Sequence, residues 1–266
     1  SGYGAVRPAP SVPVDASPHV WPEMCTLAKF TVPICATHLL ELSLSVVSVL
    51  SLGHLGTVEL ASASLAGITA NVTGFSVISG LVSALDTLLP ASYTRQPHLM
   101  GLWTLRGGLL EVAVVPQRLV LWLKAERGLI LLGQDPDIAY NARQFLMVLS
   151  FGLPGVAIFA LCRRFLQAQG MMHAPTVVLI IVSPLNAIAN FFLVWGPERY
   201  RIGFLGAPMA SALSMWLMAA LCAVQCAVAC RDTWGGLSRD VGAPAALRTC
   251  VSRGVARLSS LASACW

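Results

Sequence analysis

Charged side chains are scarce in this chain. Asp, Glu, Lys and Arg make up only 11% of its 266 residues, whereas 56% are hydrophobic. This balance leaves too little polar surface to coat a water-soluble protein of this size, so we expect a lipid bilayer to cover part of it. The net charge of +5 is spread between apolar runs and forms no basic patch, which argues against nucleic-acid binding.

The chain also lacks the short motifs that mark metal and catalytic sites. Its eight cysteines form no CxxC pair, and none of its five histidines stands at metal-ligand spacing from them. No GxSxG or HExxH segment appears either, which disfavours a membrane-embedded enzyme. We therefore predict no enzymatic activity, no metal, no cofactor and no disulfide framework.

Long apolar runs are present in place of such motifs. A membrane-spanning helix needs about 20 mostly apolar residues, and the chain holds several runs of that length. The predicted fold class is an all-α membrane protein, a bundle of six transmembrane helices at residues 27–52, 61–89, 102–123, 138–161, 175–195 and 204–230. Pro90 is expected to end the second helix, and the GLPG segment at 152–155 to break the fourth.

The two ends of the chain differ from its apolar middle at 27–230. Residues 1–26 are rich in Pro and lack periodicity, which predicts a disordered cytosolic tail. Residues 231–266 turn to Arg, Ser, Ala and Gly, which predicts a poorly ordered tail, truncated or divergent. A cytosolic N-terminus places 11 of the 17 basic residues on the cytosolic side, as the positive-inside rule requires. We predict a multi-pass protein of the plasma or vacuolar membrane.

One polar stripe interrupts the first predicted helix. His38, Glu41, Ser45 and Ser48 recur at steps of three, four and three residues, which confines them to an arc of about 80°. An acid at this depth costs roughly 2.5 kcal/mol or more if it faces lipid, so Glu41 is expected to face a water-filled cavity. The alternative is that Glu41 hydrogen-bonds a neighbouring helix and only holds the bundle together.

The second predicted helix repeats this spacing. Ser76, Ser79, Ser83 and Asp86 again follow one another at steps of three, four and three, so the two helices are expected to present polar faces to one cleft. Asp86 stands near the helix end. There a carboxylate can also reach the membrane surface or bind a nearby arginine such as Arg95, which is the structural alternative.

The fifth predicted helix carries two asparagine side chains within its apolar run. Asn186 and Asn190 are one helical turn apart, and such amides either join helices or line a pore. Together with the residues of the other two stripes, they complete the set that we predict to bind substrate or ions.

Several segments resemble a known family. GHLGTVELASASLAGITANVTGF at 53–75, followed by SALDTL, is similar to the signature that joins helices one and two in the multidrug and toxic compound extrusion family. LLGQDPDIA before the fourth helix agrees in order and spacing, as do RRFLQAQG and the SPLNAIANFFLVWGP run that follows it. The segment TLLPASYTRQPHLMGLW resembles the fungal branch. The resemblance covers residues 27–230.

The resemblance implies a fold of twelve helices in two six-helix lobes that alternate access across the membrane. This chain would be the N-terminal lobe, and its partner would be a missing C-terminal lobe. The acid of bacterial relatives aligns with Ser48, and Glu41 is an available substitute two turns earlier. The implied function is secondary-active efflux of amphipathic, cationic organic compounds in exchange for protons or sodium ions. The alternative is a non-transporting membrane scaffold or an incomplete gene model.

Overall fold

The computed structural model describes residues 20–95, 100–197 and 202–229. The predicted tails, 1–26 and 231–266, lie outside these ranges except for residues 20–26, which are helical. All regular elements in the described ranges are helices. In chain order they are α1 (Val20–Gly53), α2 (Thr57–Ala70), a π-helical turn (Asn71–Phe75), α3 (Ser76–Ser83), α4 (Leu85–Arg95), α5 (Met100–Leu123), α6 (Ala125–Leu131), α7 (Pro136–Ser150), α8 (Leu153–Ala168), α9 (His173–Trp195), a 3-10 turn (Gly203–Leu205) and α10 (Gly206–Ala229).

Helices occupy all six positions predicted from the apolar runs. By length and composition, four of the described helices can cross a membrane, or five when the bent pair α7 and α8 counts as one span. α5 lies where the third span was predicted, but Arg106, Glu111 and Arg118 interrupt its apolar sequence. The predicted all-α membrane fold is therefore confirmed, with α5 as its most polar long helix.

Two predicted helix ends are wrong. Pro90 lies inside α4, which continues to Arg95. The long helix is interrupted at Ala84, and Pro90 stands in the second turn of the helix that starts again at Leu85, as proline can inside membrane helices. The fourth span was predicted to end at residue 161, but α8 continues to Ala168. This extension brings two arginines onto the helix.

The predicted break at the GLPG segment is confirmed. α7 ends at Ser150 and α8 begins at Leu153, and the two axes are bent by 51°. Just after the bend, a Cβ built on Gly155 would lie 3.0 Å from the backbone of Met215, so α8 and α10 approach one another closely at this glycine. The bend and the small residue together set how α8 lies against α10.

The π-helical turn interrupts the second span. Its Thr73 hydroxyl accepts a hydrogen bond of 2.9 Å from Nε1 of Trp122 on α5. A Cβ built on Gly74 would lie 2.7 Å from the same indole ring. The turn is therefore held in place by a buried tryptophan, and it contains one residue more than an α-helical turn.

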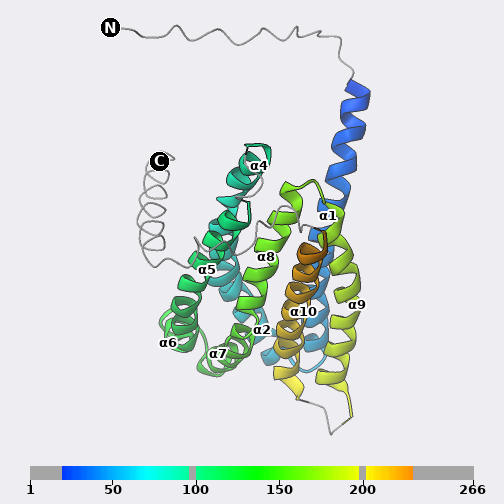
Figure 1. Ribbon diagram of the computed structural model, residues 1–266. Helices are drawn as coiled ribbons and strands as arrows, with labels where there is room; N and C mark the ends of the chain where they lie inside the picture. The colour runs from blue at the N-terminus through cyan, green and yellow to red at the C-terminus, as the bar shows by residue number, and fades with distance from the viewer. Residues whose placement is uncertain (1–19, 96–99, 198–201, 230–266) are drawn as a thin grey trace, which may run out of the picture.

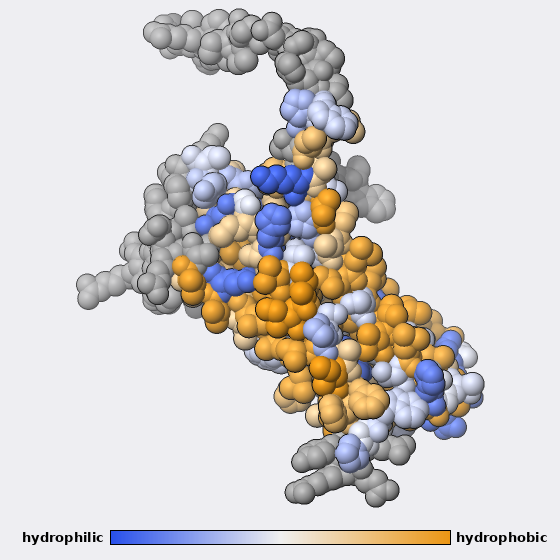
Figure 2. All heavy atoms as spheres, turned by 90° about the vertical axis from the view of Figure 1, so that its right-hand side faces the viewer, coloured by the Kyte–Doolittle hydropathy of each residue, from blue (hydrophilic) through white to orange (hydrophobic). Residues whose placement is uncertain are grey.

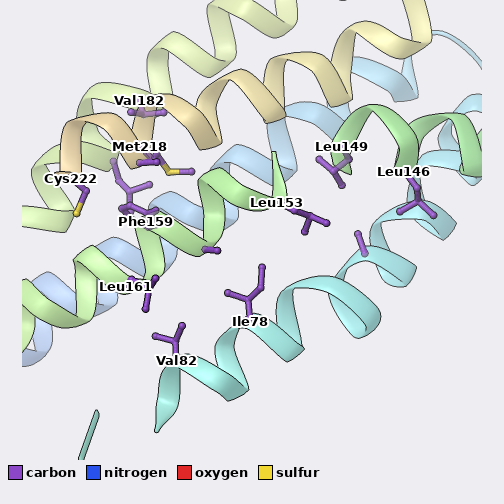
Figure 3. Close-up of a cluster of buried hydrophobic side chains, with 14 of the residues drawn as sticks. Ile78, Val82, Leu146, Leu149, Leu153, Phe159, Leu161, Val182, Met218 and Cys222 are labelled. Atoms are coloured by element: carbon purple, nitrogen blue, oxygen red, sulfur yellow. The ribbon is translucent and has the colours of Figure 1, made fainter. Parts of the chain in front are cut away.

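The bundle is built around α10. α10 packs against both α8 and α9, α9 packs against α1, and α2 packs against α7 (Figure 1). Within the core, Ile78 and Val82 of α3 point toward Leu153 and Leu161 of α8 (Figure 3).

The outer surface is apolar where a bilayer would lie. Seen from the side, hydrophobic side chains form a broad band across the middle of the molecule, with polar groups above and below it (Figure 2). Large apolar side chains of α1 and α9 are exposed, among them Leu39, Ile180, Ile188 and Phe191. In water this surface would be costly, so lipid is the solvent that it suits.

Candidate functional site

A partly open cavity of about 760 Å³ lies between the helices of the bundle. Its wall is formed by α1, by α2 and α3 with the π-helical turn between them, and by α7, α8, α9 and α10. Much of the wall is apolar, with Phe75, Phe159 and Met218 among its larger side chains. The polar and charged groups on it are His38, Glu41, Ser45, Ser48, Asn71, Ser79, Arg163, Arg164, Asn186, Ser211 and Ser214.

Charged groups from three helices meet at one end of this cavity. The Glu41 carboxylate of α1 accepts a hydrogen bond of 2.5 Å from Nη1 of Arg163 on α8. Its second oxygen lies 3.1 Å from Nδ1 of His38. The next residue of α8, Arg164, forms an ion pair of 3.1 Å with Asp86 of α4. Two consecutive arginines of α8 thus form ion pairs with acids on two different helices.

The Glu41–Arg163 pair is partly shielded from solvent. The exposed fraction is 12% for the Arg163 side chain and 31% for that of Glu41. Nε of Arg163 is buried and has no hydrogen-bond partner, so the guanidinium is not held in a two-point, fork-like contact. A single nitrogen holds the carboxylate.

The other polar end of the cavity is an uncharged network. Ser48 lies 3.2 Å from Ser211 on α10, and Asn190 donates to Ser48 at 3.4 Å. Asn186 donates to Ser214 at 2.8 Å. These bonds join α1, α9 and α10, so both amides have the helix-joining role that the sequence left open, and Asn186 also lines the cavity.

The structure brings together most of the residues predicted from the sequence. The whole stripe of α1 lines the cavity, and Ser79 and Asn186 join it. The predicted residues that do not line it are Ser76, Ser83, Asp86 and Asn190.

The two serines outside the cavity donate hydrogen bonds to the backbone of their own helical segment. Ser76 donates to the carbonyl of Asn71 and Ser83 to that of Gly80, both at 2.7 Å, and both side chains are solvent-exposed. Asp86 is paired with Arg164 rather than with the Arg95 considered from the sequence.

Sequence reasoning missed the two arginines of the cavity. The predicted fourth span ends at residue 161 and therefore leaves Arg163 and Arg164 beyond the helix. In the structure they stand in the last two turns of α8. A signal was available, since RRFLQA continues the apolar spacing of the helix without a Gly or Pro to end it.

A second ionisable pair lies away from this cavity. Glu111 and Arg118 of α5 are 3.6 Å apart, with exposed fractions of 2% and 4%. Neither carboxylate oxygen of Glu111 has a hydrogen-bond partner, and the same holds for all three guanidinium nitrogens of Arg118. In the sequence these two residues stand out only as charged interruptions of an apolar run.

A helical bundle with an apolar belt, and with a cavity whose wall carries ionisable side chains, has the architecture of a multi-pass membrane protein. The sequence matches the MatE family over residues 33–192. The match covers more than half of the chain, and the chain belongs to this family. The resemblance to multidrug and toxic compound extrusion proteins is thereby confirmed.

Curated relatives come from fungi, animals and plants. "Uncharacterized transporter C4B3.13" of Schizosaccharomyces pombe is 39% identical over 83% of this chain and 41% of its own length. "Multidrug and toxin extrusion protein 2" of Mus musculus is 34% identical over 84% of this chain and 39% of its own. This chain therefore spans about two-fifths of the length of these relatives.

Solved structures agree with this assignment. The crystal structure of the eukaryotic MATE transporter AtDTX14 matches with a TM-score of 0.77 and 28% identity, over 82% of this chain and 49% of that one. A MATE protein in the bent conformation matches with a TM-score of 0.71 at 15% identity, which shows the fold alone. Both matches cover about half of the longer chain.

Proposed function

We propose that this chain forms the N-terminal lobe of a secondary-active transporter that exports amphipathic, cationic organic compounds in exchange for protons or sodium ions. The observation that carries the proposal is an ionisable carboxylate, Glu41, on the wall of a cavity inside a membrane bundle. A second lobe, absent from this chain, would complete the cavity and alternate its access.

The cavity has the size and surface that such compounds need. Ligand sites for small molecules usually have volumes of about 300–1,000 Å³ and mostly apolar walls, and this cavity of about 760 Å³ falls within that range. Phe75, Phe159 and Met218 offer apolar and aromatic surface to a hydrophobic body. Among the described residues that line the cavity, Glu41 alone offers a carboxylate to a positive charge.

Coupling would follow from competition at one carboxylate. A proton on Glu41 removes the charge that attracts an organic cation, so loading one ligand expels the other. Ser48, which takes the place of the bacterial acid, lies on the same wall and cannot ionise. Glu41 is thus the carboxylate that we assign to coupling within this lobe.

The membrane context completes the proposal. Glu41 precedes Ser48 along α1, so the charged end of the cavity lies nearer the start of α1 than the uncharged end does. With the N-terminus in the cytosol, this end faces the cytosol, from which an exporter takes its substrate. We place the transporter in the plasma or the vacuolar membrane.

The test is Glu41→Gln in the full-length transporter. Glutamine keeps the size and hydrogen bonding of glutamate but cannot titrate or attract a cation. We expect the variant to fold but to lose the acceleration of export by an imposed proton gradient, and, in a parallel assay, by a sodium gradient.

Glu126→Gln is the matched control. Glu126 also accepts a hydrogen bond from an arginine, Arg143 at 3.1 Å, but it lies on α6, outside the cavity. Export by this variant should keep its dependence on the gradient. Unchanged dependence on external pH and sodium in Glu41→Gln would assign coupling to another acid and leave Glu41 as a structural residue.

A further inference from the structure

We propose that Arg163 is a tethered cation that occupies Glu41 between transport events, so that an incoming cation must displace it. The pair is then a removable bridge across the cavity from α1 to α8. The inference rests on the proposed function in one respect, namely that cations bind at Glu41. The bridge itself can be tested without transport.

The packing of the helices shows that the bridge crosses open space. In the described part of the chain, α1 packs mainly against α9, α2 and α10, whereas α8 packs mainly against α10 and α5. α1 and α8 therefore face one another across the cavity that both line. The contact between Glu41 and Arg163 joins them at its charged end.

One hydrogen bond joins Arg163 to Glu41. Arg163 uses one nitrogen, and its Nε has no partner. Glu41 is also within reach of His38, which keeps a donor beside the carboxylate after the guanidinium leaves. A fork-like, two-point pair would be stronger and slower to exchange.

The bridge makes the cavity selective for charge. A cationic compound, or a proton, can neutralise Glu41 and release Arg163, because each replaces the charge that the guanidinium supplied. A neutral compound has no such effect and leaves the bridge closed. Arg163 is thus a specificity-determining residue that sets how tightly a cation must bind before the cavity opens.

The first experiment measures binding of tetraphenylphosphonium, a lipophilic monovalent cation, to the full-length transporter in nanodiscs. Arg163→Gln removes the internal competitor, and we expect binding about ten-fold tighter than in the wild type. Arg163→Lys keeps a tethered charge and should bind as the wild type does. Arg143→Gln breaks an arginine pair outside the cavity and is the matched control. Binding to Arg163→Gln no tighter than to this control would overturn the proposal.

The second experiment measures opening of the cavity. Ser45 lines the cavity one turn beyond Glu41 and is already exposed, so Ser45→Cys in a background without other cysteines reports how far access from water increases when the bridge is removed. Glu41→Gln and Arg163→Gln should each raise its rate of reaction with a charged maleimide at least three-fold, and Glu126→Gln should not. If Arg163→Gln does not fold, Glu41→Gln alone decides, because it releases the same arginine. No increase in rate would refute the bridge.

The two experiments separate the bridge from the proposed function. Faster labelling with no binding or export of organic cations would keep the bridge and reject the export function. Export of cations with unchanged labelling and unchanged affinity in Arg163→Gln would keep the function and reject the bridge.

Discussion

Replacing both members of the buried Glu111–Arg118 pair with methionine is expected to stabilise the protein. The two groups are 3.6 Å apart, and all five of their charged-group nitrogen and oxygen atoms lack a hydrogen-bond partner. A buried ion pair repays the loss of its hydration only when good geometry and further hydrogen bonds accompany it. This pair has the attraction without the bonds.

The magnitude follows from the geometry. At 3.6 Å and an effective dielectric constant of about 20, the attraction is about 4–5 kcal/mol. Removing each charge from water costs several kcal/mol, so the sum for two ions exceeds that attraction. We therefore expect the double variant to gain about 1–4 kcal/mol of unfolding free energy, and either single variant to lose about 3–5 kcal/mol because a lone charge stays buried.

The assay is reversible unfolding of the four proteins in mixed micelles. This double-mutant cycle measures the coupling between Glu111 and Arg118 directly. The partly exposed pair of Glu126 and Arg143 is the reference, and replacing both of its members should change stability by about 0–1 kcal/mol. If the Glu111→Met/Arg118→Met protein is less stable than the wild type, the argument from missing hydrogen bonds is refuted.

Two further predictions concern the span formed by α2, the π-helical turn and α3. Gly74→Ala would place a methyl group 2.7 Å from the Trp122 ring and should lower the free energy of unfolding by about 1–3 kcal/mol. A methyl group at Gly80 meets nothing within 4 Å, so Gly80→Ala should be neutral or stabilising. Equal effects of the two substitutions would contradict this packing. Ser79→Cys should react with water-soluble maleimides and Ile188→Cys, on the exposed apolar face of α9, should be protected by lipid; equal protection of both would refute the cavity.

The sequence was sufficient for the stripe of α1 because that helix is continuous. Across 34 residues no turn of another kind changes its period, so His38, Glu41, Ser45 and Ser48 line the cavity as their spacing predicts. The presence of a partner for Glu41 could not be predicted, because it depends on where the distant α8 ends.

The stripe of the second span was only partly correct for a physical reason. The π-helical turn adds one residue and rotates α3 by about 100° relative to α2. The side of α3 that faces the cavity carries Ile78, Ser79 and Val82, whereas Ser76 and Ser83 project about 40–60° to the other side of Ser79 and remain outside. The residues Asn71–Phe75 do not themselves predict the π-helical turn. The turn is stabilised by the indole of Trp122, which is distant in sequence.

The neighbouring positions of Arg163 and Arg164 have a mechanical consequence. Successive residues project from a helix about 100° apart, so α8 carries two ionic attachments at different angles around one axis. A rotation of α8 that draws one guanidinium away from its acid also shifts the other. A rotation of α8 would therefore move α1 and α4 together, because one of its arginines is paired with each of these helices.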